Sequence, residues 1–310
     1  MKICSFLPSG TEILFALGLN DSVRGVTFEC DYPAEAKTKP VVVLSKLPQG
    51  LSQGEIDRQV KIYSERSESL YQLDAEKLLE IQPDLIVTQE LCHVCAASPN
   101  DIGAIFARLS FVPKILALTP KNMDDVLHDV ITVGIATERE KEASELVDDL
   151  RARIKTISQL QPRYRPRVLC LEWLDPPFIG GHWVPEMVRI AGGRDVLGVP
   201  GIRSFETDWK TIAKSDPDMI LVMPCGYHTH EVERELKTVQ LPSEWHELRA
   251  VRQGTVFATD ASSHFSRPGP RIVNGIEFMA QLFHQYSRSN VRKSAQLVEL
   301  KPPLIASRMI

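Results

Sequence analysis

Short apolar runs alternate with stretches of helical periodicity along the whole chain. The apolar runs are KICSFL, VRGVTF, DLIVTQ and KILAL in the first part, then RVLCLEW, MILVM and GTVFAT in the second. Runs of this length, separated by amphipathic helical segments, predict strands that alternate with helices and pair in parallel. The pattern therefore predicts an α/β protein.

The first helix carries end signals in the sequence. Ser9 is in position to act as N-cap, Glu12 stands three residues later as its capping-box partner, and Gly18 follows the last apolar turn. This combination is typical of the two ends of a helix. We predict a helix that starts at Ser9, directly after the first strand.

A long amphipathic stretch divides the strand-bearing parts. Apolar residues recur there at three- and four-residue spacing, namely Ala143, Leu146, Val147, Leu150, Ile154 and Ile157. The spacing predicts a helix over about 138–159, with Thr137 and Glu140 as a capping box and Pro162 beyond its end. Such a helix spans roughly 30 Å at 1.5 Å per residue, so it predicts one stiff connector.

The two parts also resemble each other. LLEIQPDLIVTQELC, residues 78–92, matches TIAKSDPDMILVMPC, residues 211–225: a helix end, Pro-Asp, an apolar strand and a cysteine. Two copies of one unit are one interpretation, and the general likeness of any two helix–strand units is the other. We predict an N-terminal α/β lobe over 1–120, a connecting helical segment over 121–161, a C-terminal α/β lobe over 162–285 and a tail over 286–310.

Composition narrows the class of function. The chain has 310 residues, 43% of them hydrophobic and 25% charged, and a formal net charge of −4. No basic surface is indicated, so nucleic acid is excluded as the expected partner. No run approaches the roughly 18 apolar residues of a transmembrane segment, and no signal peptide is recognised. The location stays unknown: cytoplasmic for the chain as it stands, periplasmic if a leader has been removed.

Residues that follow the predicted strands are candidates for function, because ligands bind outside the carboxyl ends of parallel strands. Glu29 and Glu172 end strands in different lobes, and paired carboxylates are compatible with acid–base catalysis. No nucleophile motif or glycine-rich phosphate loop accompanies them. We therefore predict a protein that is not an enzyme and has no catalytic residues.

Several separated motifs resemble one family. FLPSGTEILFALGL, GVTFECDYPAEA, QPDLIVTQ, WLDPPFIGGHWVPEMVRIAGG and FSRPGPRIVNGIE occur in the order found in the cobalamin-binding substrate-binding proteins of ABC transporters. These belong to the wider group that binds siderophores, haem and corrinoids. The likeness covers about residues 1–285.

The resemblance implies two similar parallel-sheet lobes joined by one long backbone helix, with the ligand held between the lobes. It implies cobalamin, or a related corrinoid or metal tetrapyrrole, as ligand, and an ABC permease as a possible partner. The predicted ligand-binding residues follow from this resemblance together with two chemical features of the sequence: aromatic side chains that suit a flat macrocycle and the guanidinium fork of Arg267. They are Pro8, Ser9, Thr11, Phe28, Glu29, Cys30, Glu172, Trp173, His182, Trp183, Tyr227, Phe265 and Arg267.

The six cysteines leave three interpretations open. Cys4 and Cys170 lie inside predicted strands and are expected in the core. The other four, Cys30, Cys92, Cys95 and Cys225, follow strands. They either pack as small apolar residues, or bind zinc or an iron–sulfur cluster, or include a redox pair at Cys92 and Cys95. The alternative function is accordingly a cytosolic metal or iron–sulfur protein on the same fold.

Overall fold

The computed structural model describes residues 1–288 except 90–102, 104, 161 and 163. The chain divides into two compact units. Unit 1 comprises Met1–Ala152 and Arg267–Ile272; unit 2 comprises Arg153–Ser266 and the described part of Val273–Ile310. Each unit contains one β-sheet with its own helices.

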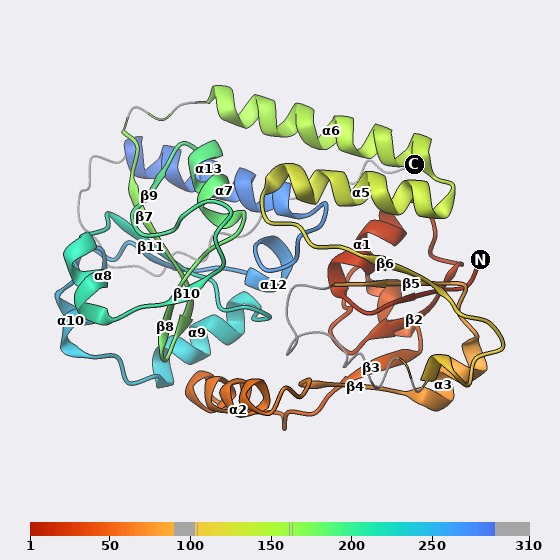
Figure 1. Ribbon diagram of the computed structural model, residues 1–310. Coiled ribbons are helices and arrows are strands. Elements are labelled where there is room, and N and C mark those ends of the chain that lie inside the picture. Colours follow the sequence, from red (N-terminus) through yellow and green to blue (C-terminus); the bar gives the residue numbers. More distant parts are fainter. Residues whose placement is uncertain (90–102, 104, 161, 163, 289–310) are drawn as a thin grey trace. The chain divides into compact units, whose positions relative to one another are not determined.

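Unit 1 contains a six-stranded sheet in the order β4-β3-β2-β1-β5-β6. Its elements, shown in Figure 1, are β1 (Ile3–Ser5), α1 (Pro8–Ala16), β2 (Val23–Thr27), the 3-10 helix η1 (Ala34–Thr38), β3 (Val41–Ser45), α2 (Gln53–Glu65), β4 (Tyr71–Leu73), α3 (Ala75–Ile81), β5 (Leu85–Thr88), β6 (Lys114–Ala117) and α5 (Met123–Thr137). Helix α6 (Glu140–Gln159) begins in unit 1 and continues into unit 2.

Unit 2 contains a sheet in the order β10-β8-β7-β11-β12, with β9 also paired to β7. Its elements are β7 (Arg167–Leu174), β8 (Pro177–Ile179), α7 (Val184–Ile190), β9 (Arg194–Asp195), β10 (Phe205–Glu206), α8 (Trp209–Ser215), β11 (Met219–Val222), α9 (Thr229–Thr238), α10 (Ser243–Glu247), α11 (Arg249–Arg252), β12 (Val256–Ala258), α12 (Ala261–His264) and α13 (Ile272–Arg288). Helix α13 runs past Gln285, so the predicted tail begins as helix.

The predicted α/β class and the seven predicted strands are confirmed, and the centre of each sheet is parallel. The expectation of purely parallel sheets is wrong at the edges. Strand β4 runs antiparallel to β3, and β8 runs antiparallel to both β7 and β10. Strands β7 and β8 are joined by only two residues, and such a short connection permits only antiparallel pairing. The apolar run VVVLS, which forms β3, was not among the predicted strands.

The predicted capping of the first helix is wrong. Helix α1 starts at Pro8, and its N-cap is Leu7, which makes no side-chain capping bond. Proline suits the first helical position because its missing N–H would have no partner there. Ser9 lies inside the helix, and Glu12 is 3% exposed and binds arginine instead of a backbone amide. Gly18 follows the helix with a positive φ of 71°, as predicted.

The predicted connecting segment over 121–161 contains two helices, and the second of them, α6, matches the predicted connector helix. Helix α5 ends where Glu138 adopts a left-handed φ of 59°, and α6 starts at Glu140 and ends at Gln159, as predicted. Thr137 is the last residue of α5, where its hydroxyl donates to the Val133 carbonyl at 2.7 Å, so it does not occupy the position directly before α6. A side chain at Gly134 would lie 2.4 Å from the Ala143 Cβ, so glycine is needed where the two helices meet. The two units divide at Ala152, inside α6.

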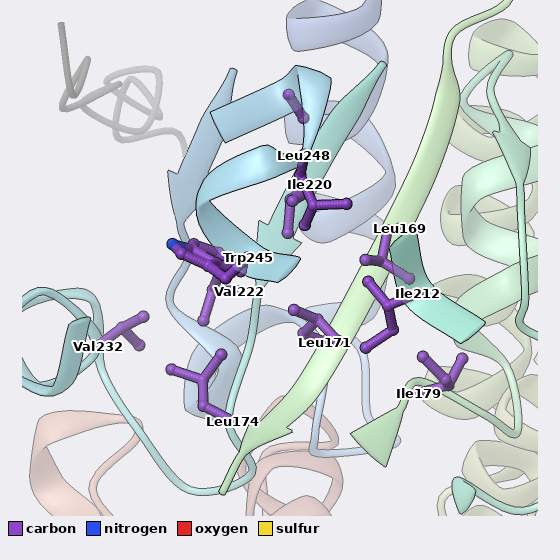
Figure 2. Close-up of a cluster of buried hydrophobic side chains, with 11 residues drawn as sticks. Leu169, Leu171, Leu174, Ile179, Ile212, Ile220, Val222, Val232, Trp245 and Leu248 are labelled. Carbon is purple, nitrogen blue, oxygen red and sulfur yellow. The ribbon is translucent and has the colours of Figure 1, made fainter. Parts of the chain in front are cut away.

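A cluster of buried side chains forms part of the unit 2 core (Figure 2). Leu169 and Leu171 of β7 and Ile220 and Val222 of β11 contribute alternate positions, as expected of one sheet face. Trp245 covers them and is 6% exposed. Cys170 and, in the other unit, Cys4 are fully buried, so their predicted place in the core is confirmed.

The internal repeat is visible at one turn in each unit. Helices α3 and α8 both end at a left-handed residue, Gln82 and Asp216, which Pro-Asp and a parallel strand follow. In unit 1, the Asp84 carboxylate accepts the backbone N–H of Lys2, and the Asp84 N–H donates to the Lys2 carbonyl. In unit 2, Asp218 makes the same two bonds with Arg167.

No helix in the described part of the chain is both long and apolar enough to cross a membrane.

Candidate functional site

In unit 1, the carboxyl ends of β1 and β2 carry the predicted residues of the first lobe. Pro8, Ser9 and Thr11 lie in the first turn of α1, where Ser9 is 2% exposed and Thr11 is fully buried. Phe28 follows β2, is 44% exposed, and its ring centroid lies 6.1 Å from that of Tyr71. Of these residues, Phe28 offers the largest apolar surface to a ligand.

Cys30 has hydroxyl partners on two elements. Its Sγ lies 3.1 Å from the Thr11 hydroxyl and 3.2 Å from the Thr27 hydroxyl, and the residue is 4% exposed. Burial raises the pKa of the Cys30 thiol, although the hydrogen bonds from Thr11 and Thr27 act in the opposite direction. A buried thiol of this kind behaves as a small packed group.

Arg267 is held by acidic groups of its own unit. Its guanidinium donates to the Asp31 carboxylate, donates to the Glu29 carbonyl at 2.8 Å and lies 3.5 Å from Glu12. Burial acts to lower the pKa of Arg267, but the Asp31, Glu12 and Glu29 charges outweigh it, so the pKa is raised. Arg267 is therefore permanently charged at the carboxyl end of β2.

Arg271 completes this cluster. It makes two bonds to Glu12, at 2.9 and 2.5 Å, and its guanidinium carbon lies 4.0 Å from the centre of the Tyr32 ring. Arg271 therefore pairs with a residue far away in the chain, because Glu12 belongs to α1. Burial, the largest effect, raises the pKa of Glu29, while Arg267 lowers it.

In unit 2, Glu172 joins three segments. Its carboxylate accepts a short hydrogen bond from the Ser204 hydroxyl and a second bond from the Gly181 N–H. Burial raises the pKa of Glu172 to about 7, because the charged form loses hydration and these two bonds only partly compensate. Ser204, which no motif in the sequence marks, thus fixes a predicted site residue.

His182 has an unusual backbone. Its φ is +53°, its N–H donates to the Ile202 carbonyl at 2.6 Å, and its carbonyl accepts from Gly201 at 2.9 Å. It lies outside α7, whose N-cap is Trp183. Burial lowers the pKa of His182, and Arg203 adds to this effect. The ring therefore favours its neutral form, in which one nitrogen has a free lone pair for a metal.

The aromatic predictions separate into two kinds. Trp183 is 6% exposed and donates its indole N–H to the Phe265 carbonyl at 2.8 Å, and Phe265 is 2% exposed, so both belong to the core of unit 2. Trp173 and Tyr227 are half-buried, with ring centroids 5.8 Å apart at an interplanar angle of 71°. Of these four unit 2 residues, only Trp173 and Tyr227 offer aromatic surface to a ligand.

The predicted cysteine site stays a prediction. Cys92 and Cys95 lie outside the described residues, and Cys30 and Cys225 belong to different units. Cys225 is exposed. Among the residues that the structure describes, no group of three or more His, Cys, Asp and Glu side chains is arranged to hold a metal ion.

Comparison with known proteins gives a consistent result. The model of the family described as "Periplasmic binding protein" matches residues 3–262. An uncharacterised ABC transporter substrate-binding lipoprotein of Bacillus subtilis (strain 168), YvrC, is 25% identical over 293 residues, 90% of this chain and 79% of that protein. A vitamin B12-binding protein of Vibrio cholerae is 22% identical over 280 residues, 89% of this chain and 86% of that protein.

A solved structure shares the fold. The periplasmic haem-binding protein RhuT from Roseiflexus sp. RS-1, in its apo form, superimposes with a TM-score of 0.68 at 21% identity, covering 93% of this chain and 99% of that one. With two α/β units built on one repeated turn, and a family model that matches most of its length, this chain belongs to the periplasmic binding protein family of solute-binding proteins.

Proposed function

We propose that this protein binds cobalamin, or a related corrinoid or metal tetrapyrrole, and delivers it to an ABC-type permease. It acts by binding alone, without chemical conversion of the ligand. The names of two relatives support the class of ligand and of partner: one is a vitamin B12-binding protein and another an ABC transporter substrate-binding lipoprotein. The solved haem-binding structure supports the same flat, metal-bearing kind of ligand.

The observation that carries the proposal is the Trp173–Tyr227 pair at the carboxyl edge of the unit 2 sheet. Trp173 lies near the end of β7, and Tyr227 follows β11, the neighbouring parallel strand. Aromatic rings at such an edge present a large apolar face with a polar tip, which suits a flat macrocycle with polar substituents. Phe28 offers a similar face at the carboxyl end of β2 in unit 1.

Charged and polar groups in each unit suit the substituents of such a ligand. In unit 1, Arg267 has a guanidinium fork, which recognises amide and carboxylate oxygens. In unit 2, Glu172 accepts bonds from Ser204 and Gly181 and lies one residue from Trp173. We expect amide side chains of a corrinoid to exchange hydrogen bonds with groups of this type.

The test is titration of the protein with hydroxocobalamin, followed by visible absorbance and calorimetry. Binding of one equivalent at micromolar concentration is expected. Replacing Trp173→Ala should weaken binding roughly two- to ten-fold, because an aromatic contact contributes ~0.5–1.5 kcal/mol beyond its buried area. Trp209→Phe is the matched control, since Trp209 forms a similar edge-to-face pair with Trp245 but belongs to α8. No response to hydroxocobalamin or haemin would refute the proposal.

A further inference from the structure

The helix that follows Tyr227 places a carboxylate beside it. Tyr227 directly precedes His228, the N-cap residue of α9, and the Glu231 carboxylate accepts the His228 N–H at 2.9 Å. That N–H belongs to the peptide bond that joins Tyr227 to His228. Strand β11 and helix α9, which this segment connects, are visible in Figure 1. The Trp173–Tyr227 pair, which suits the ring of a ligand, therefore has a negative charge next to it.

Glu235 adds a second carboxylate on the same side of α9. It lies four residues after Glu231, so the two side chains are neighbours one turn apart, and both are half-buried. Burial is the largest cause that raises the pKa of Tyr227 to about 12; the Glu235 and Glu231 charges also raise it, and Arg234 lowers it. The tyrosine hydroxyl, which is the polar tip of the aromatic pair, thus lies in the field of two negative charges.

Asp260 brings a third carboxylate to this edge of the sheet. It follows β12, the parallel neighbour of β11, and its two oxygens lie 3.1 and 3.2 Å from His228 Nδ1. The Asp260 side chain is 28% exposed. An imidazole compensates this charge only when it is protonated. Three carboxylates thus lie at the carboxyl ends of β11 and β12, where open α/β sheets bind ligands.

In unit 1, the charges of the two site arginines are compensated by the protein itself. Glu12 pairs with both Arg267 and Arg271, and Asp31 binds Arg267 as well. The Arg267 guanidinium also donates to the Glu29 carbonyl at 2.8 Å, and the two arginine side chains are only 11% and 13% exposed. An anionic substituent of a ligand would have to compete with Glu12 and Asp31 for these guanidiniums.

Charges of this kind distinguish between two classes of flat ligand. The corrin ring of cobalamin carries amide substituents, whereas haem carries propionate carboxylates. An amide needs only hydrogen-bond partners, and carboxylate oxygens of the protein can accept from its NH2 group. A ligand carboxylate would instead face like charges, and the hydration that it loses on binding would not be compensated by a cation.

We infer that Glu231 and Glu235 of α9 select against anionic ligands, so that the ligand is an amide-bearing corrinoid and not a porphyrin with free carboxylates. This inference rests on the proposed function, which leaves both classes open. The name of one relative states that it binds vitamin B12 and that of another that it binds haem, so the family does not decide between them. The two glutamates act through space on the substituents of a ligand that contacts Tyr227, and they need no bond to it.

The experiment compares two ligands that differ in a single charge. One is cyanocobalamin, and the other is its monoacid, in which one propionamide of the corrin ring is hydrolysed to a carboxylate. Calorimetric titration at low ionic strength gives the dissociation constant of each. We expect wild type to bind the monoacid roughly two- to five-fold more weakly for each nearby glutamate, which is the range for a single exposed charge pair. At about 1 M salt, where the screening length falls to about 3 Å, the two constants should become nearly equal.

Glu231→Gln combined with Glu235→Gln removes both charges and should reduce the ratio of the two dissociation constants by roughly two-fold or more. Glutamine keeps a carbonyl oxygen that can accept the His228 N–H, so the start of α9 is retained. Glu233→Gln is the matched control, because it removes the same charge from the opposite side of α9, about 200° from Glu231, and should leave the ratio as in wild type. The comparison of low and high salt uses wild type alone, and it serves if the double variant fails to fold.

The outcomes separate this inference from the proposed function. Equal affinity of wild type for cyanocobalamin and its monoacid at low salt, or tighter binding of haemin than of cyanocobalamin, would overturn the selection against anions while the proposed function stands. A ratio that neither salt nor the double substitution changes would also overturn it, since the discrimination would then be steric. An equal loss of the ratio in Glu233→Gln would contradict the assignment to Glu231 and Glu235. If wild type binds neither cyanocobalamin nor its monoacid nor haemin, the proposed function fails and this inference fails with it.

Discussion

The same Pro-Asp turn occurs in both units, but its aspartate has different surroundings in each. Asp84 of unit 1 is exposed, and its carboxylate accepts the Lys2 N–H at 2.6 Å. Asp218 of unit 2 is 1% exposed. It accepts the Arg167 N–H at 2.8 Å and the Tyr164 hydroxyl at 2.7 Å, and it lies 2.8 Å from the Arg249 guanidinium. A repeated sequence motif therefore gives the same backbone bonds but very different burial of charge.

Glu12 and Glu172 also differ between the units, but here the carboxylate with arginine partners belongs to unit 1. Glu12 of unit 1 is buried with two arginines, Arg267 and Arg271. Glu172 of unit 2 accepts bonds from the neutral Ser204 hydroxyl and Gly181 N–H, with no cation as partner among the residues that the structure describes, and burial raises its pKa to about 7. The two carboxylates thus differ in whether a cation compensates for lost hydration. A buried charge with cations depends on every partner, whereas a buried carboxyl without one becomes easier to protonate.

The largest expected effect is that of Glu12→Ala. The substitution leaves Arg267 and Arg271, whose side chains are only 11% and 13% exposed, without the carboxylate between them. Removing one partner of a buried ion pair costs ~3–5 kcal/mol, so we expect a loss of that size in the free energy of unfolding of unit 1. Urea denaturation measures it. A loss below ~1 kcal/mol would mean that Asp31 alone balances Arg267.

The second largest expected effect distinguishes the two repeated aspartates, Asp218 and Asp84. Asp218→Ala removes the common partner of Tyr164 and Arg249 and should cost ~3 kcal/mol, since a buried charged network is broken. Asp84→Ala, the matched control in unit 1, should cost ~1 kcal/mol, the contribution of one exposed hydrogen bond. Thermal and urea unfolding of both variants check the difference. Equal losses would show that the burial of Asp218 does not set its contribution to stability.

The smallest expected effect depends on pH. The folded pKa of Glu172 is raised to about 7 from 4.5, so the folded protein binds this proton more tightly than the unfolded chain. Stability from this group is fully present below about pH 4.5 and is lost as pH rises through about 7. Because Glu172 is partly exposed, we expect the loss in the free energy of unfolding to be ~2 kcal/mol. Unfolding of Glu172→Gln at pH 5 and pH 8 should show a smaller change than wild type; an equal change would assign the titration elsewhere, for example to Asp195 or Asp129.

The sequence predicted much of the framework. Apolar runs located seven strands, and the spacing from Ala143 to Ile157 located the helix that ends at Gln159. These signals are local, because burying one face of a helix or strand requires apolar residues at a regular spacing along the chain. The capping predictions at Ser9 and Thr137 failed, because α1 already starts at Pro8 and α5 extends as far as Thr137.

The candidate site was less accessible to sequence reasoning. Its strand-end positions followed from the fold class, but their roles did not, since Trp173 and Trp183 occur in the same stretch, and Trp173 is half-buried whereas Trp183 is buried. Ser204 and Asp260 carry no signal that links them to Glu172 and His228, because their partners lie 32 residues away in each case.

The sequence by itself determined the α/β class, the repeated Pro-Asp turn and the strand ends at which function was expected, because these depend on residues close together in the chain. Only the tertiary structure decided which charges are compensated, as for Glu12 against Glu172, and which aspartate is buried, as for Asp218 against Asp84. The free energy of a charge depends on the atoms around it in space, and those atoms come from distant parts of the chain.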